Sequence, residues 1–246
     1  MKRFKWQITL GIILIILTII VYVIHYLVFR DAHHIFIYLI GDIAFVFFEV
    51  LLVTLVIHRL LNEREKRARM EKMNMVIGAF FSEVGTRLLT YFSDSDPELE
   101  TIRQILIIDK DWSEREFIAV SKRLRNYDYG VDIQKVDLEH LHNFFADKRD
   151  FLLRLLENPN LLEHESFTEL LWAVFHLTEE LVHREDVKQL PDTDRKHLAG
   201  DIKRVYVSLV HQWLDYMEHL KNNYPYLFSL ALRTNPFDQN ASPVVK

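Results

Sequence analysis

Two long apolar segments occupy the first 57 residues of the chain. The residues after them are charged and amphipathic. Ile8–Phe29 carries no formal charge when its histidine is neutral. Residues 35–57 contain only two acids, Asp42 and Glu49. An α-helix rises about 1.5 Å per residue, so each segment is long enough to cross a hydrocarbon layer of about 30 Å. The pattern predicts two transmembrane helices joined by a tight turn.

The second apolar segment contains no residue that would end a helix where its charged part begins. From Arg59 onward most residues are good helix formers, and the first clear breaker is the sequence SDSDP at residues 93–97. We therefore expect the second span to continue as a long helical stalk, from about residue 35 to about residue 92. Within this stalk Gly78, Ser82 and Gly85 form a strip of small residues. This strip either allows another helix to pack closely, or its glycines are simply tolerated on the surface. Apolar residues recur there at spacings of three and four: Met70, Met73, Ile77, Phe80, Phe81, Val84, Leu88 and Tyr91.

The rest of the chain is punctuated as a series of amphipathic helices. Ser113 with Glu116 and Ser166 with Glu169 match the capping box, and Asp96 precedes a proline at a first helical position. No strand pair or glycine-rich phosphate loop is evident. The fold class is therefore predicted to be all-α, a helical bundle following a two-helix hairpin. The expected helices cover about residues 97–109, 114–127, 137–157, 167–188, 193–223 and a short stretch after Pro225.

These patterns predict four parts of the chain. Residues 1–34 form the first transmembrane span and outer turn, and residues 35–93 form the second span and its stalk. Residues 94–233 form a cytoplasmic α-helical domain, and residues 234–246 form a flexible C-terminal tail. The aromatic run at residues 222–237 either closes the bundle as a cap or docks on a partner or on the membrane face.

Basic residues set the expected orientation of the hairpin. Three precede the first apolar segment and six follow the second closely, while the connector at residues 30–34 holds one arginine, offset by Asp31. By the positive-inside rule both termini lie in the cytoplasm, which makes the protein a multi-pass membrane protein with two spans. The first apolar run is longer than a usual signal core and lacks a small-residue cleavage site, so we expect it to be retained.

The overall composition limits which kinds of site and partner the chain can have. The absence of cysteine excludes disulfides, thiolate metal sites and cysteine nucleophiles, and is compatible with a reducing cytosol. The net charge of −5 gives no indication of nucleic-acid binding, and the basic run after the second span fits anionic lipid headgroups. We therefore expect the lipid bilayer, and no nucleic acid, as a partner.

Polar residues inside the two apolar segments are the strongest pointers to function. Asp42 and Glu49 are seven residues apart, so they lie within about 20° of each other on one helix face. The first segment carries a polar stripe that includes Thr18, Tyr22 and His25. These groups either hold the hairpins of different subunits together, form a proton or ion path, or sense pH.

A second candidate site lies in the sequence HLTEELVHRE, where His176, Glu180 and His183 share one helical face with Trp172 nearby. Helical di-iron proteins use Glu-x-x-His pairs, and Glu180 with His183 is such a pair. However, this face lies about 160° to 220° from the apolar stripe of its own helix. We therefore predict no metal site and no cofactor here, and interpret the face as solvated or as a candidate partner surface.

Together these features favour a membrane-anchored cytoplasmic scaffold or signal-transducing module that is homo-oligomeric and not an enzyme. Self-association is expected through the transmembrane hairpin, and an unidentified cytoplasmic protein is a further candidate partner. An alternative is a small oligomeric channel or proton-conducting protein that uses Asp42 and Glu49. A third is a helical metalloenzyme that uses His176, Glu180 and His183.

Overall fold

A computed structural model of the chain describes residues 2–245, without the side chains of residues 2–5, 7, 67–69, 162 and 163. Several of the basic side chains behind the predicted orientation fall outside the described side chains: Lys2, Arg3, Lys5, Arg67 and Arg69. Within the described residues all regular structure is helical, so the all-α fold class is confirmed. The chain divides into two compact units, Met1–Glu65 and Lys66–Lys246.

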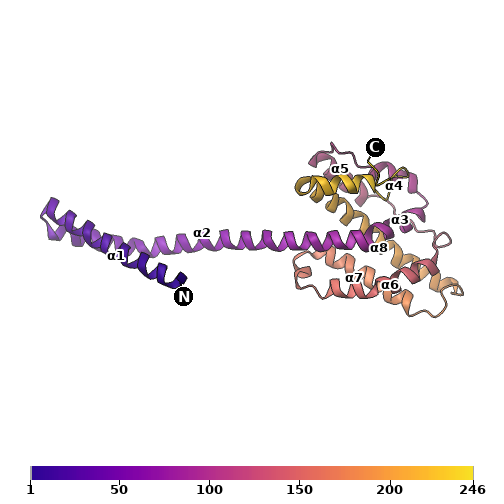
Figure 1. The fold of residues 1–246 in the computed structure, drawn as a ribbon, viewed down its shortest axis with the longest axis horizontal. Coiled ribbons are helices and arrows are strands. Elements are labelled where there is room, and N and C mark those ends of the chain that lie inside the picture. The colour runs from indigo at the N-terminus through magenta and orange to yellow at the C-terminus, as the bar shows by residue number, and fades with distance from the viewer. Residues whose placement is uncertain (1, 246) are drawn as a thin grey trace. The chain divides into compact units, whose positions relative to one another are not determined.

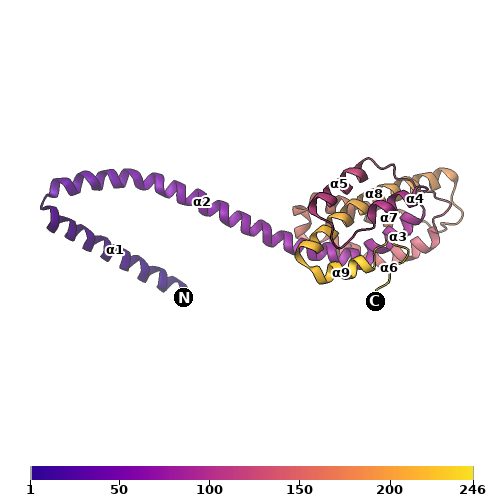
Figure 2. The same cartoon turned by 90° about the horizontal axis from the view of Figure 1, so that it is seen from above.

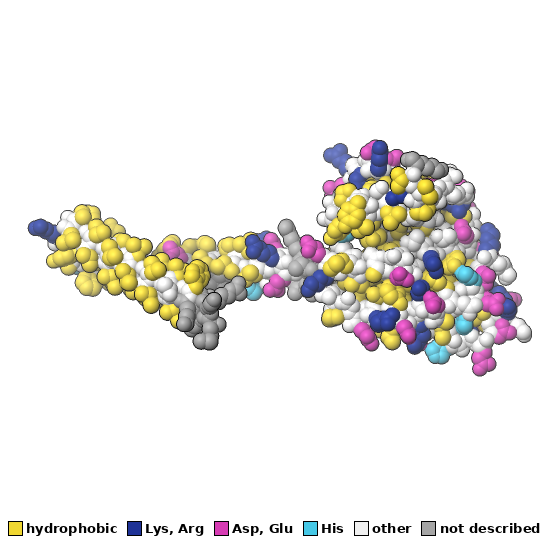
Figure 3. Space-filling view, in the orientation of Figure 1, with side chains coloured by type: hydrophobic (Ala, Val, Ile, Leu, Met, Phe, Trp, Pro, Cys, Tyr) yellow, Lys and Arg dark blue, Asp and Glu magenta, His cyan; other side chains and the backbone are white. Residues whose placement is uncertain are grey.

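The first unit contains helix α1 (Lys2–Phe29) and the beginning of helix α2 (Ala32–Phe80). Figure 2 shows the sharp turn between them. Arg30 adopts a positive φ of 49° in this turn, and the Asp31 carboxylate accepts hydrogen bonds from the backbone N–H groups of His33 and His34. Both helices contain stretches long and apolar enough to cross a membrane. Their apolar side chains are exposed in the single chain, as the hydrophobic surface in Figure 3 illustrates.

Helix α2 is followed without a break by a π-helical turn, η1 (Phe81–Gly85), and by helix α3 (Thr86–Asp94). The sequence predicted uninterrupted α-helix here, and the π turn is the difference. A π turn inserts one extra residue, which allows the adjacent residues Phe80 and Phe81 to be buried together. Gly85 is needed in this turn because a Cβ atom there would lie 2.6 Å from Cδ1 of Phe81.

Among its described residues the second unit adds six further α-helices, which Figure 1 labels in part. Their order follows the predicted series, although several ends differ. Helix α7 begins with His164 as N-cap, whose Nδ1 accepts from the N–H of Phe167, so the predicted cap at Ser166 was wrong. The capping box of Ser113 and Glu116 is present. The helices are α4 (Leu99–Leu106), α5 (Glu114–Arg125), α6 (Leu138–Leu156), α7 (Glu165–Val182), α8 (Asp192–Asn223) and α9 (Pro225–Arg233), with a 3₁₀ turn, η2 (Pro159–Glu163), before α7.

Helix α8 forms the centre of the second unit, because it packs against α3, α5, α7 and α9. The end of α2 contributes Met73, Ile77 and Phe80 to the same core. Phe80 meets Phe167 of α7 edge to face, with ring centroids 5.4 Å apart. Burying such aromatic and aliphatic side chains is the main force that holds the helices together.

The C-terminal segment is anchored more firmly than a flexible tail from residue 234 would be. Asn235 donates a hydrogen bond of 2.9 Å to the Leu106 carbonyl, and Phe237 packs against Trp213. Both Asn235 and Phe237 are buried. The expected start of the tail therefore needs correction, since the packed structure reaches at least Phe237.

Candidate functional site

The polar residues of the hairpin make few contacts within the single chain. Asp42 and Glu49 are exposed, and no hydrogen bond or ion pair to either is found among the described residues. His25 contacts His34 across the turn, with 3.3 Å between ring nitrogens, and does not pair with Asp42. The Thr18 hydroxyl donates to the Leu14 carbonyl of its own helix. One copy of the hairpin thus leaves both carboxylates uncovered.

A polar cluster joins α7 to α8 at the face that carries His176 and Glu180. The Nε2 atoms of His176 and His197 lie 3.6 and 3.3 Å from Oδ2 of Asp201. They also lie 3.9 and 3.6 Å from the carboxylate oxygens of Glu180. Asp201 is only 3% exposed, and its Oδ2 makes no hydrogen bond within the described residues although both rings lie close to it.

Two arginines neutralise the acids of this cluster. Arg184 donates to Glu180 at 2.8 Å and to both oxygens of Asp194 at 2.7 and 2.8 Å. These hydrogen bonds hold the pKa values of Glu180 and Asp194 below their usual range. Arg204 lies 3.1 Å from Oδ1 of Asp201. Glu180, Asp194 and Asp201 therefore each have an arginine as ion-pair partner.

The residues of this cluster differ from those of the metal site in the metalloenzyme hypothesis. His183 is not part of the cluster, since its side chain is largely exposed and its Nδ1 contacts Glu179. Among the described residues, no group of three or more His, Asp or Glu side chains is placed to hold a metal ion. Trp172 is 59% exposed on the same helix, so its indole is free to contact another molecule.

An apolar pocket of about 620 Å³ is the second feature of this unit. It is larger than two other pockets described in the structure, of about 310 and 210 Å³. The α2 side of the pocket is formed by Asn74, Met75 and Gly78, and the opposite side by Tyr226 and Leu230 of α9. Concave, mostly apolar surfaces of this size are the usual form of binding sites.

The floor of this pocket is uncharged. Burial lowers the pKa of His219 and raises that of Tyr216, so both side chains are neutral near pH 7. Nδ1 of His219 lies 3.2 and 3.1 Å from the amide nitrogens of Asn74 and Asn223. Because Asn223 donates through the same nitrogen to a carbonyl, Nδ1 is an acceptor and the ring proton lies on Nε2. The lining holds no Asp, Glu, Lys or Arg.

Comparison with known proteins places the chain in a family. The model described as "Uncharacterized protein MJ1433, C-terminal helical domain" matches residues 69–233. The model described as "MJ1433, N-terminal helical domain" matches residues 2–61. The chain belongs to the MJ1433 family. Uncharacterized protein MJ1433 from Methanocaldococcus jannaschii is 49% identical over 237 residues, which are 96% of this chain and 95% of that protein. No solved structure matches the chain.

The two MJ1433 family models describe two helical domains and give no catalytic or specific role. The two family models leave residues 62–68 between them. The two compact units of the structure divide within this stretch, between Glu65 and Lys66.

In this member of the MJ1433 family, the sequence analysis named only His176 and Glu180 of the α7–α8 cluster and missed both His197 and Asp201. His197 and Asp201 are four residues apart on α8, as His176 and Glu180 are on α7. The repeat of a histidine followed by an acid at i+4 was the available signal. It was overlooked because a helical wheel treats each helix alone and does not show which neighbour covers a polar face.

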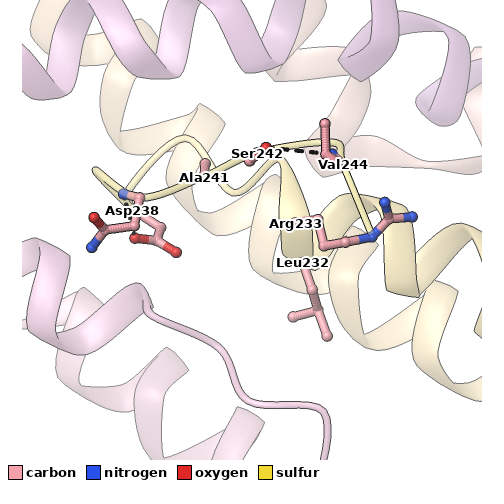
Figure 4. Close-up of a pocket in the computed structure, with 7 residues that line it drawn as sticks. Leu232, Arg233, Asp238, Ala241, Ser242 and Val244 are labelled. Atoms are coloured by element: carbon pink, nitrogen blue, oxygen red, sulfur yellow. Dashed lines mark hydrogen bonds between the residues drawn. The ribbon is translucent and has the colours of Figure 1, made fainter. Parts of the chain in front are cut away.

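A smaller pocket lies at the end of α9, where the C-terminal segment folds back (Figure 4). Arg233 donates to the Pro243 carbonyl, and the N–H of Val244 donates to Ser242 Oγ. This pocket has about 310 Å³, half the volume of the apolar pocket, so the apolar pocket and the α7–α8 cluster are treated as the principal sites of this unit.

Proposed function

We propose that this chain is a membrane-anchored cytoplasmic scaffold or signal-transducing module, acting as a homo-oligomer and without catalysis. Two helices long and apolar enough to span a bilayer support the anchor, and the distribution of basic residues supports cytoplasmic termini. The spans meet the bilayer through their exposed apolar side chains. Trp172 is the candidate contact for a cytoplasmic protein partner.

The observation that carries self-association is the exposure of Asp42 and Glu49 in a single hairpin. A charged side chain at the centre of a bilayer costs about 2.5 to 3.5 kcal/mol on insertion scales, so such groups normally face protein or water. No partner for either acid lies within the described part of the same chain. A second hairpin supplies the missing cover, and polar contacts then hold the hairpins together.

The signal-transducing role rests on the continuity of α2. One helix contains the acids in its apolar part and, further along, Met73, Ile77 and Phe80 in the core of the second unit. A rotation or shift of α2 at the hairpin contact would therefore move side chains that pack against α7 and α8. Such small helix shifts are a common form of switching in proteins.

Replacement of Glu49 tests the proposal. Glu49→Gln keeps the ability to hydrogen-bond and should preserve assembly, whereas Glu49→Leu should weaken it by about 1 to 2 kcal/mol. The measurement is oligomer dissociation in detergent for wild type and both variants. Equal assembly in all three would refute self-association through the acids.

A channel is the second candidate function, because the same acids would line a path between hairpins. Ion flux into liposomes separates the two functions. Flux that is lost in Glu49→Gln while assembly is retained would favour the channel, and no flux in wild type would favour the scaffold.

A further inference from the structure

We propose that the apolar pocket binds a small, uncharged and mostly hydrocarbon molecule that carries a hydroxyl or carbonyl oxygen. All the residues that line this pocket belong to the second unit, so the inference does not depend on the hairpin or on its self-association. It goes beyond the proposed function, because it gives the helical unit a ligand of its own.

The walls of the apolar pocket suit a hydrocarbon ligand. On the α2 side Met75 is 65% exposed, and on the α9 side Tyr226 is 70% exposed beside the exposed Leu227 and Leu230. The volume of about 620 Å³ lies within the range of about 300 to 1,000 Å³ that is usual for small-molecule pockets. A bound hydrocarbon removes this apolar surface from water, which is the main source of affinity in such sites.

Two neutral hydrogen-bonding side chains of α8 line the same pocket. Tyr216 and His219 are three residues apart, so they lie on one face of the helix. The Tyr216 ring stacks on Phe81, with ring centroids 5.2 Å apart, and its hydroxyl would lie 3.2 Å from a Cβ atom on Gly78. This packing holds the Tyr216 hydroxyl in place, although the hydroxyl makes no hydrogen bond within the described part of the chain.

His219 provides a second unused donor. Its Nε2 carries the ring proton and is buried, yet no acceptor for it is found among the described residues. Buried N–H groups without an acceptor are rare in proteins, so each one calls for a partner outside the chain. The Tyr216 hydroxyl is less covered than this nitrogen, so we assign it as the principal contact for the ligand oxygen. His219 then serves an acceptor that reaches the floor of the pocket.

The charge of the lining decides which class of molecule fits. Among the described residues that line the pocket, none is Asp, Glu, Lys or Arg. An ionised ligand would lose water without gaining an opposite charge, which disfavours carboxylates, phosphates and amines. Flat ring systems gain further contacts with aromatic side chains, and the lining contains four: Phe81, Tyr216, Tyr224 and Tyr226. An uncharged phenol or alcohol on a ring system is therefore the best match.

Protection of an introduced thiol tests this assignment, because the natural chain contains no cysteine. Ser82→Cys places a thiol at an exposed position in the lining of the pocket. Ser229→Cys is the matched control, because Ser229 is exposed on α9 and is not part of that lining. The full-length variants are placed in phospholipid nanodiscs at pH 7 and treated with a water-soluble maleimide. The probes are 2-naphthol, which is uncharged, and 2-naphthoate, which has the same rings and an anionic head group.

We expect 2-naphthol to slow the reaction of Ser82→Cys, with half protection below about 1 mM, and to leave Ser229→Cys unchanged. 2-Naphthoate should need at least tenfold more for the same protection. Adding Tyr216→Phe, which keeps the ring that stacks on Phe81, should raise the half-protecting concentration of 2-naphthol by about three- to tenfold. Circular dichroism checks that each variant keeps its helices.

Four results would count against the proposal. No protection of Ser82→Cys by 2-naphthol at about 5 mM would overturn the site. Equal slowing at Ser82→Cys and Ser229→Cys would overturn it as well, because the probe would then act through the bilayer or the maleimide. Equal protection by 2-naphthol and 2-naphthoate would overturn the uncharged class of ligand, and unchanged protection in Tyr216→Phe would overturn the contact with the hydroxyl.

Discussion

Phe81 packs its ring against the backbone of Gly85 so closely that a Cβ atom on Gly85 would lie 2.6 Å from Phe81 Cδ1. The same atom would lie 2.9 Å from Cε1 of Phe80. Both aromatic rings are buried, so neither can move aside without disturbing the core. We therefore expect Gly85→Ala to lower the free energy of unfolding by about 1 to 3 kcal/mol. Thermal unfolding of the purified protein measures the effect.

Gly200 provides the matched control, because it lies in α8 and no atom would come within 4 Å of an added Cβ. Alanine is the better helix former, so Gly200→Ala should raise stability by about 0.5 to 1 kcal/mol. A stable Gly85→Ala would show that the π turn relaxes to ordinary α-helix at no cost.

Arg184 is expected to make stability dependent on acid pH. Its hydrogen bonds lower the pKa values of Glu180 and Asp194 below their ordinary 4.5 and 3.8. A carboxyl with a lowered pKa in the folded state adds stability above its ordinary pKa, and that stability is lost as pH falls through the folded value. Arg184→Met should therefore cost about 2 kcal/mol at pH 7. The difference from wild type should shrink as pH falls below 3.8.

Urea unfolding at pH 7, 5 and 3 checks this expectation. Lys203→Met is the control, because Lys203 contacts only the fully exposed Asp128 among its ion-pair partners in the described residues. Exposed pairs contribute little, so this variant should differ from wild type by less than about 1 kcal/mol at each pH. An Arg184→Met deficit that does not change with pH would assign its effect to packing.

The α7–α8 cluster is expected to contain no tightly held metal. Arg184 and Arg204 already pair with Glu180 and Asp201, which leaves the carboxylates with little need for a cation. Metal analysis of protein purified without chelator should show substoichiometric zinc, iron and manganese. One equivalent that disappears in His197→Ala but persists in His183→Ala would reverse this judgement and revive the enzyme hypothesis.

The spacing of apolar residues in the sequence was sufficient to predict the helices of this fold. It was not sufficient to predict the polar contacts between them. The capping box at Ser113 was predicted correctly because it depends on residues three apart in the chain. The π turn was not, because its cause is the simultaneous burial of Phe80 and Phe81 against other helices. The partnership of His176 with Asp201 likewise depends on how α7 packs on α8. The pattern within one helix, such as a histidine followed by an acid at i+4, does not show which helices will pack together.

The orientation of the hairpin in the membrane is predicted from the basic residues on either side of it. The turn at residues 30–34 should lie outside the cell, because it carries one arginine offset by Asp31. His33→Cys places a thiol in this turn, where His33 is exposed and only its backbone binds Asp31. Val244→Cys places one near the C-terminus, where Val244 is 65% exposed.

Because the natural chain has no cysteine, a membrane-impermeant maleimide reports on each introduced thiol alone. In intact cells His33→Cys should be labelled and Val244→Cys should not, and permeabilisation should expose Val244→Cys. The reverse pattern would invert the orientation and place the helical domain outside. Protein that stays in the soluble fraction, with both thiols labelled only after lysis, would show that α1 and α2 do not span a membrane, and the roles proposed for Asp42 and Glu49 would fall with it.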